Sequence, residues 1–118
     1  MPKTLQAFDL STPFDCAPLA AGALEPDAAL HVALRLKALA DPVRVRVMSL
    51  LLAAGEEGIC TCDLAPAVGL TDATVSHHLK QLREAGFVEG TRDGMNVYYR
   101  PVRSALAALV RVIDPECC

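Results

Sequence analysis

Residues 70–88, LTDATVSHHLKQLREAGFV, form the most informative segment of this chain. It predicts a single helix with a defined start and a defined end. Thr71 can cap the N-terminus with its hydroxyl group, and Asp72 in the first turn suits the positive end of the helix dipole. Gly86 ends the helix, because glycine readily adopts the left-handed conformation found just after helices. An apolar stripe at helical spacing along one side consists of Val75, Leu79 and Leu82.

The opposite side of this helix is polar, and its side chains are short and hydrogen-bonding toward the N-terminal half. A helix that reads base edges in a DNA major groove needs such side chains, together with hydroxyl groups and a lysine that hold phosphates. An ordinary solvated amphipathic helix is the alternative interpretation of this stretch taken alone. The candidate DNA contacts on this side are Thr71, Ala73, Thr74, Ser76, His77, Lys80 and Gln81.

The segments on either side of this helix predict a helix-turn-helix followed by a wing. Residues 59–70, ICTCDLAPAVGL, predict a short helix and a glycine-containing turn that leads into the longer helix. After the longer helix, two β-prone runs flank Asp93-Gly94, which is a hairpin turn signal. The tip of such a hairpin is placed to contact the neighbouring minor groove or the DNA backbone. The two runs span residues 87–92 and 96–100, and the candidate contacts at the tip are Arg92 and Asn96.

Two helices are predicted before this unit. The first starts near Pro26, where proline and neighbouring acidic residues favour a helix start, and it runs through Ala40. Asp41-Pro42 breaks this helix and starts the next, which ends near Ala54.

A last helix opens at residues 101–103 and has an apolar side. With no remaining core to fill, this side suggests a dimer surface. The predicted fold class is therefore mainly α with a small β-hairpin wing, a dimeric winged helix-turn-helix. The residues of the apolar side are Leu106, Leu109, Val110 and Ile113.

Length and composition limit the possible folds and functions of this chain. At 118 residues the chain is one domain by size, and its modest core makes a dimer a reasonable expectation. The net charge of −3 counts against a nonspecific polyanion binder, but a sequence-specific DNA reader depends on the local field at its docking face. No apolar run is long enough to span a bilayer, and the N-terminus has no secretion signal. We therefore expect a cytoplasmic protein with no membrane partner.

The chain divides into three parts. Residues 1–25, rich in breakers of regular structure, form an N-terminal arm. Residues 26–113 form the winged helix-turn-helix domain for DNA binding and dimerisation, and residues 114–118 form a tail that contains cysteine. No Ser–His–Asp set, phosphate loop or HExxH pattern is present, so the sequence does not predict an enzyme.

Three segments carry a family resemblance: LKALADPVRVRVMSLL (36–51), ICTCDLA (59–65) and TVSHHLKQLREAGFV (74–88). Together they resemble the ArsR–SmtB family of metalloregulatory winged-helix repressors over residues 28–113. The second segment, with its CxCDL pattern, is typical of the family's thiolate-sensing members.

The resemblance implies a homodimeric transcriptional repressor that leaves its operator DNA when an ion binds. It also implies that the DNA end of the helix carries Thr74, Ser76, His77 and His78. By helical geometry His78 falls beside the apolar stripe, where a half-buried structural role is the alternative. The expected phosphate contacts are Arg44, Lys80 and Arg92.

Five cysteines in such a chain favour functional thiols or metal ligands over structural disulfides. Thiolates are soft ligands that select arsenite, antimonite, cadmium, lead or zinc. Cys60 and Cys62 would point about 200° apart in a regular helix, so they would share an ion only if the first helical turn opened. Such an opening would shift the recognition helix and weaken its docking. The predicted third ligand is Cys16 of the arm, from the same subunit or from the other.

The leading hypothesis is a repressor that responds to trivalent arsenic, As(III), or antimony, Sb(III). A sensor of Cd(II), Pb(II) or Zn(II) is the close alternative, with four thiolates expected in place of three. Cys117 and Cys118 are a second candidate pair of ligands. A thiol redox switch at Cys60 or Cys62 is an interpretation of a different class, and small buried cysteines without a function are the remaining one.

Overall fold

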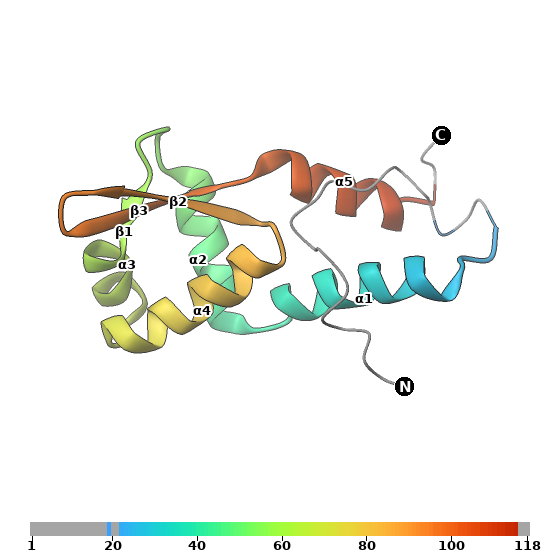
Figure 1. Ribbon diagram of the computed structural model, residues 1–118, viewed down its shortest axis with the longest axis horizontal. Coiled ribbons are helices and arrows are strands. Elements are labelled where there is room, and N and C mark those ends of the chain that lie inside the picture. Colours follow the sequence, from blue (N-terminus) through green and yellow to red (C-terminus); the bar gives the residue numbers. More distant parts are fainter. Residues whose placement is uncertain (1–18, 20–21, 116–118) are drawn as a thin grey trace.

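A computed structural model describes residue 19 and residues 22–115 of the chain (Figure 1). Within these residues, the chain forms five α-helices and three short strands. The elements are α1 (Pro26–Leu39), α2 (Pro42–Ala53), β1 (Ile59–Cys60), α3 (Thr61–Val68), α4 (Asp72–Glu84), β2 (Val88–Asp93), β3 (Asn96–Pro101) and α5 (Arg103–Ile113). The predicted fold class is confirmed: the chain is a mostly helical winged helix-turn-helix.

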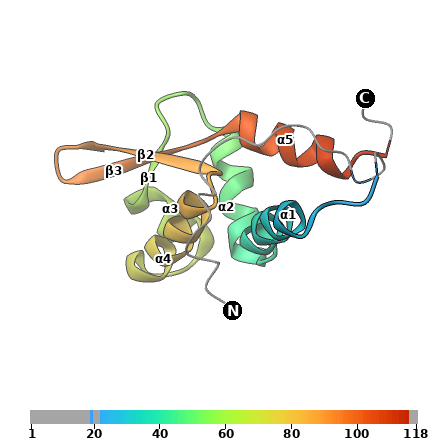
Figure 2. The same ribbon diagram turned by 45° about the vertical axis from the view of Figure 1, so that its right-hand side comes forward.

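The elements are arranged around α2, which lies between two groups. Helices α3 and α4 lie under the small sheet, and the β2–β3 hairpin projects away from the rest of the molecule (Figures 1 and 2). Helices α1 and α5 lie at the opposite end (Figures 1 and 2). No helix in the described part of the chain is both long enough and apolar enough to cross a membrane.

The boundaries of α2 and α4 follow from local side-chain chemistry. Asp41 precedes α2, and its Oδ1 accepts hydrogen bonds from the backbone N–H groups of Val43 at 2.8 Å and Arg44 at 3.3 Å. Thr71 precedes α4, and its Oγ1 accepts a hydrogen bond from the N–H of Thr74 at 3.3 Å. These are N-caps, which satisfy N–H groups that have no partner inside a helix. Both predicted helix starts are confirmed.

The end of α4 is also as predicted. Gly86 has a φ of 85°, the left-handed conformation that glycine adopts at little steric cost. Its N–H donates to the carbonyl of Arg83, and the N–H of Phe87 donates to the carbonyl of Leu82. The chain therefore leaves the helix in a tight turn and enters β2 directly, which ties the position of the wing to that of α4.

The wing is a two-stranded antiparallel hairpin, with one difference from the prediction. Asp93 pairs with Asn96 as the last pair of the ladder, so Gly94 and Met95 form the loop and Asp93 belongs to the strand. Gly94 has a φ of 68°, which a two-residue hairpin loop requires at that place.

The third strand, β1, was not predicted. The sequence analysis assigned residues 59 and 60 to a helix, but they pair with β3, with Ile59 opposite Tyr99 and Cys60 opposite Tyr98. The sheet order is therefore β1-β3-β2. Backbone pairing to a strand far along the chain overrides the local pattern here, because a two-residue segment has no periodicity of its own.

The core lies where α2, α3 and α4 meet under the sheet. The apolar stripe predicted for α4 is fully buried in it. Side chains with at most 1% exposure include Val47, Leu51, Leu64, Val75, Leu79, Leu82, Phe87 and Val112.

The apolar side predicted for α5 as a dimer surface is only partly open. Val110 is 63% exposed and Ile113 is 47% exposed, but Leu109 is buried and Leu106 is half-buried. Ala108 and Val112 are buried with Leu109, so α5 does pack against the core of the single chain. The helix is apolar on more than one side, so its spacing alone did not show which residues pack inward.

Candidate functional site

The polar side of α4 is open to solvent along its N-terminal half. Most of the predicted DNA contacts on this helix are exposed, and they share one surface because they follow the helical repeat opposite the buried stripe. Gln81 and His78 are half-buried at the flanks of this surface. The exposed members are Thr71, Ala73, Thr74, Ser76, His77 and Lys80.

His78 contacts the protein rather than standing free. Its Nδ1 accepts a hydrogen bond from Nε of Arg44 at 3.1 Å, and its ring lies edge-on to the ring of His77 with centroids 5.9 Å apart. Arg44 also donates from Nη1 to the carbonyl of Ala38 at 3.3 Å. The guanidinium of Arg44 therefore joins the end of α1 to α4, and it is half-buried in doing so.

Asp41 lies beside this group. Desolvation raises the pKa of its carboxyl, but the hydrogen bonds from the N–H groups of Arg44 and Val43 lower it, and so do the electrostatic interactions with the side chains of His78 and Arg44. The net result is a pKa below the ordinary value of an aspartate. An ionised Asp41 therefore faces the cationic side chain that holds α4.

The tip of the wing carries the other predicted DNA contacts. Arg92 and Asn96 are exposed, and Met95 at the loop is 94% exposed. Arg100, farther down β3, is held within the wing, because its Nη2 donates to Oγ1 of Thr91 at 2.6 Å and its Nε lies 3.9 Å from the carboxylate of Glu89. Arg92 at the tip is therefore exposed, whereas Arg100 is held within the wing.

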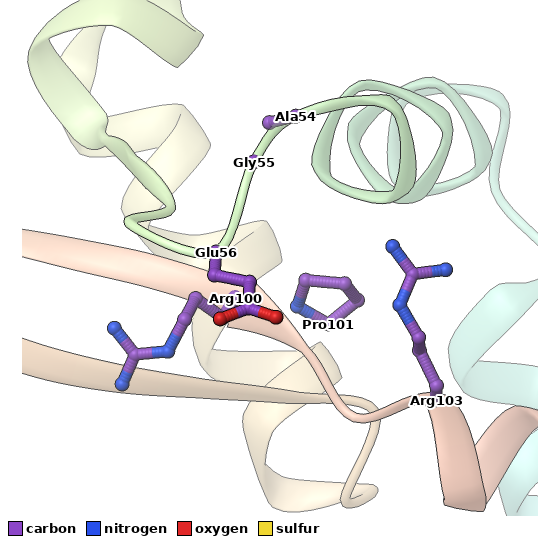
Figure 3. A pocket seen from close by; sticks show the side chains of 6 residues that line it. All are labelled: Ala54, Gly55, Glu56, Arg100, Pro101 and Arg103. Carbon is purple, nitrogen blue, oxygen red and sulfur yellow. The ribbon is translucent and has the colours of Figure 1, made fainter.

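A pocket of about 340 Å³ lies at the foot of the wing, between the loop after α2 and the start of α5 (Figure 3). Its charged lining consists of Arg100, Arg103 and Glu56. Arg103 donates to the carbonyl of Leu52 at 3.0 Å, and Figure 3 shows Pro101 between Glu56 and Arg103. Among the residues that the structure describes, no predicted site residue lines this pocket.

The thiol pair lies at the junction of β1 and α3. Cys60 is the last residue of β1 and the N-cap of α3, and Cys62 lies in the first turn of α3. Their Cα atoms are 5.2 Å apart, and the structure joins the two sulfur atoms in a disulfide. The expectation that the side chains point about 200° apart is wrong, because Cys60 has an extended backbone and precedes the helix. No opening of the helix is needed to bring the sulfurs together.

The two cysteines differ in exposure, and a third donor lies beside them. Cys60 is 1% exposed, whereas Cys62 and Asp63 are exposed. The ligand atoms of all three residues lie within 4.8 Å of one another. Asp63 was missed by the sequence analysis, although a carboxylate directly after a CxC pair was a usable signal. Once the disulfide is reduced, two thiolates and one carboxylate would suit an ion such as zinc or cadmium.

Cys16, Cys117 and Cys118 lie outside the described residues, as does most of the predicted arm. Their participation as ligands stays a prediction.

Comparison with known proteins identifies the family to which this fold belongs. Residues 41–90, from the cap of α2 to the middle of β2, match the family model described as bacterial regulatory protein, arsR family. A solved structure with the same fold is the homodimeric winged helix-turn-helix DNA-binding domain of a possible ArsR-family transcriptional regulator from Mycobacterium bovis. It is 35% identical with a TM-score of 0.61, and the match covers 78% of this chain and 87% of that one. The chain belongs to the ArsR family.

Relatives of this ArsR-family chain have names that refer to several ions. A transcriptional repressor SmtB homolog from Synechocystis is 44% identical over 62% of this chain and 53% of its own length. The arsenic resistance transcriptional regulator ArsR1 from Pseudomonas putida is 45% identical over 54% of this chain and 48% of its own. A cadmium resistance transcriptional regulatory protein CadC homolog from Staphylococcus aureus is 39% identical over 59% of this chain and 56% of its own length. This ArsR-family chain thus spans about half the length of the curated relatives it matches.

A further solved structure is the AntR antimony-specific transcriptional repressor, which is 31% identical with a TM-score of 0.63. The match covers 75% of this chain and 78% of that one. The proteins that resemble this ArsR-family chain are thus transcriptional regulators and not enzymes, and their names cover arsenic, antimony and cadmium.

Proposed function

We propose that this protein is a transcriptional repressor that binds operator DNA as a homodimer and leaves it when a soft metal or metalloid ion binds at Cys60 and Cys62. One observation carries the proposal. The thiol pair forms the start of α3, the helix that packs directly against the exposed polar helix α4. Ion ligands and DNA-reading side chains are therefore separated by a single helix.

DNA docking uses the exposed side of α4 and the tip of the wing. Helix α4 lies in the major groove, where Ser76 and His77 are within reach of base edges and Lys80 of the backbone. Arg92 at the wing tip contacts the backbone or the adjacent minor groove. In a symmetric dimer the two copies of α4 enter successive major grooves about 34–36 Å apart, so the operator is a palindrome.

The dimer is supported by apolar surface that the single chain leaves open. Val110 and Ile113 are exposed on α5, and Leu36 is 41% exposed on α1 at the same end of the molecule (Figure 1). Apolar patches of this kind on small regulators are typical of an interface. A Val110→Glu, Ile113→Glu double variant is expected to sediment as a monomer in analytical ultracentrifugation. A dimer of unchanged affinity would contradict this placement of the interface.

The inducing ion binds thiolates of Cys60 and Cys62. Both residues lie at the start of α3, and Cys62 in its first turn is exposed to solvent. For As(III) or Sb(III), which take three sulfur ligands, we propose Cys16 of the arm as the third. The arsenic and antimony regulators among the similar proteins support trivalent arsenic or antimony as the ion.

A sensor of Cd(II), Pb(II) or Zn(II) is the second candidate, and Asp63 is the observation that favours it. Its carboxylate oxygen lies within 4.8 Å of both sulfurs, and oxygen is a better ligand for zinc and cadmium than for trivalent arsenic. Asp63→Asn therefore separates the two ion classes. It is expected to weaken Zn(II) and Cd(II) binding and to leave As(III) binding unchanged.

A redox switch is a third candidate, because Cys60 and Cys62 are joined in the structure. Oxidation by hydrogen peroxide would convert two thiols and one hydrogen peroxide into the disulfide and two waters. Peroxide-driven release of DNA, reversed by a thiol reductant and absent in Cys62→Ser, would support this candidate. Ion-driven release in the presence of excess reductant supports the sensor.

The deciding experiment measures release of a duplex selected from a random-sequence library, using fluorescence anisotropy with reduced protein. Arsenite, antimonite, Cd(II), Pb(II) and Zn(II) are titrated against the wild type and the five single Cys→Ser variants, with bound ion counted per subunit. Cys60→Ser and Cys62→Ser are expected to bind the duplex and to lose the response. A normal response in either variant would refute the sensing assignment, and a wild type that ignores every duplex would refute the repressor.

A further inference from the structure

We propose that Arg44 is a positioning residue that acts through His78, fixing the ring so that its Nε2–H donates to a DNA backbone phosphate. The inference rests on the proposed binding of DNA by α4. It gives Arg44 a role different from the direct phosphate contact that the sequence suggested. The geometry of one side chain that joins three helices carries the argument.

Arg44 is held from several sides at once. Its backbone N–H donates to the Asp41 cap, its Nη1 donates to the carbonyl of Ala38 at the end of α1, and its Nε donates to Nδ1 of His78 on α4. The side chain also lines a cleft of about 250 Å³ between these helices, together with Lys37 and Glu84. The guanidinium is therefore turned into the protein, where it sets the position of α4 relative to α1 and α2.

The bond to Nδ1 determines where the proton of His78 is. An arginine Nε–H can only donate, so Nδ1 of His78 must accept, and a neutral imidazole that accepts at Nδ1 carries its proton on Nε2. Among the described residues, no hydrogen-bond partner of Nε2 is present, and no buried side-chain nitrogen or oxygen lacks a partner. Nε2–H therefore reaches solvent as a donor with a fixed direction.

The position of this donor favours a phosphate over a base edge. His78 is half-buried at the flank of α4, while His77 beside it is exposed on the side that faces the groove. Side chains at the flank of a recognition helix reach the DNA backbone, and phosphate oxygens only accept hydrogen bonds. The contact fixes the register of α4 on the duplex, and it carries no base preference.

The first test reads the tautomer of His78 by nitrogen NMR of the full-length, isotope-labelled protein without DNA, above the titration range of imidazole. The wild type is expected to show a single Nε2–H tautomer. Arg44→Met, which has no N–H donor on its side chain, is expected to show both tautomers. Arg46→Met is the matched control, because Arg46 lies on the same helix and, among the described residues, donates to the carbonyl of Ala67 at 3.2 Å and not to His78. A proton on Nδ1 in the wild type, or a tautomer unchanged in Arg44→Met, would overturn the proposal.

The second test measures binding of the selected duplex by His78 variants. His78→Asn keeps an acceptor near the place of Nδ1 and lacks the Nε2–H, so binding is expected to weaken about tenfold while the thermal midpoint stays close to that of the wild type. His78→Gln can place an amide N–H near the Nε2 position and is expected to recover most of that loss. Equal binding by His78→Asn and the wild type would refute the phosphate contact. A wild type that binds no duplex would instead refute the proposed function, whatever the NMR result.

Discussion

The glycine that precedes the thiol pair provides the sharpest test of the packing between β1 and the wing. Gly58 has a φ of 82°, and a Cβ at this position would lie 2.6 Å from the carbonyl oxygen of Tyr99 and 2.9 Å from Cγ of Arg100. The first of these atoms belongs to the backbone of β3, so it cannot move without displacing the strand. Gly58→Ala therefore combines a strained backbone with a steric clash.

The magnitude follows from comparison with Gly69, which has a φ of 73° and nothing within 4 Å of its Cβ position. Gly69→Ala involves only the left-handed conformation, which costs an L-residue about 1–2 kcal/mol. Gly58→Ala adds an overpacking cost of about 1–3 kcal/mol. The expected loss of unfolding free energy is therefore about 2–5 kcal/mol for Gly58→Ala and about 1–2 kcal/mol for Gly69→Ala.

The assay is urea unfolding followed by circular dichroism, at one protein concentration because the stability of a dimer depends on concentration. Gly94→Ala at the wing tip is a second control, with a φ of 68° and no neighbour within 4 Å. Gly58→Ala is also expected to weaken ion binding at Cys60, since it separates β1 from β3, whereas the two controls are not. If Gly58→Ala cost no more than Gly69→Ala, the close contact between residue 58 and β3 would be wrong.

Three further predictions concern the packing of Leu79, the N-cap at Thr71 and the pH dependence of the Asp41 N-cap. Leu79→Ala should lower the unfolding free energy by about 2–5 kcal/mol and Leu79→Met by less than about 1.5 kcal/mol, measured in urea; equal losses would contradict tight packing of the stripe. Thr71→Ala should cost about 1 kcal/mol and Thr71→Ser much less, and similar losses would exclude the hydroxyl as a cap. The lowered pKa of Asp41 means that its ionised form stabilises the fold above the unfolded pKa, and that this stabilisation is lost as pH falls through the folded pKa. The difference in unfolding free energy between wild type and Asp41→Asn should therefore shrink below about pH 4. A difference independent of pH would refute the stabilising role of the ionised Asp41 carboxylate.

The sequence was sufficient where a local rule decides the structure. The cap at Thr71, the end of α4 at Gly86 and the break at Asp41-Pro42 each depend on residues within one helical turn, and each is confirmed. The buried stripe of α4 has one clear periodicity, so its orientation was also predictable.

Local sequence patterns did not predict the structure where contacts between distant segments determine it. Cys60 is in a strand because β3, almost forty residues later, offers an edge to pair with. That pairing sets the geometry of the thiol pair, so the predicted 200° separation failed together with the predicted helix. On α5, both Val110 and Val112 satisfy an apolar spacing, and only packing against the core selects Val112. The hydrogen bond between Arg44 and His78 joins residues 34 positions apart, so no local sequence pattern could predict it.

The position of Cys60 bears on how an ion at this site would release DNA. Cys60 is the last residue of β1, where it lies opposite Tyr98 of the wing, and it is also the N-cap of α3, which packs on α4. A ligand that moves this one residue therefore acts on both of the elements proposed to contact DNA. Cys60 is almost fully buried, so an ion that approaches from solvent meets Cys62 and Asp63 before Cys60. Any displacement of Cys60 on ion binding would lie at the shared end of β1 and α3, so it would change the angle between wing and recognition helix directly.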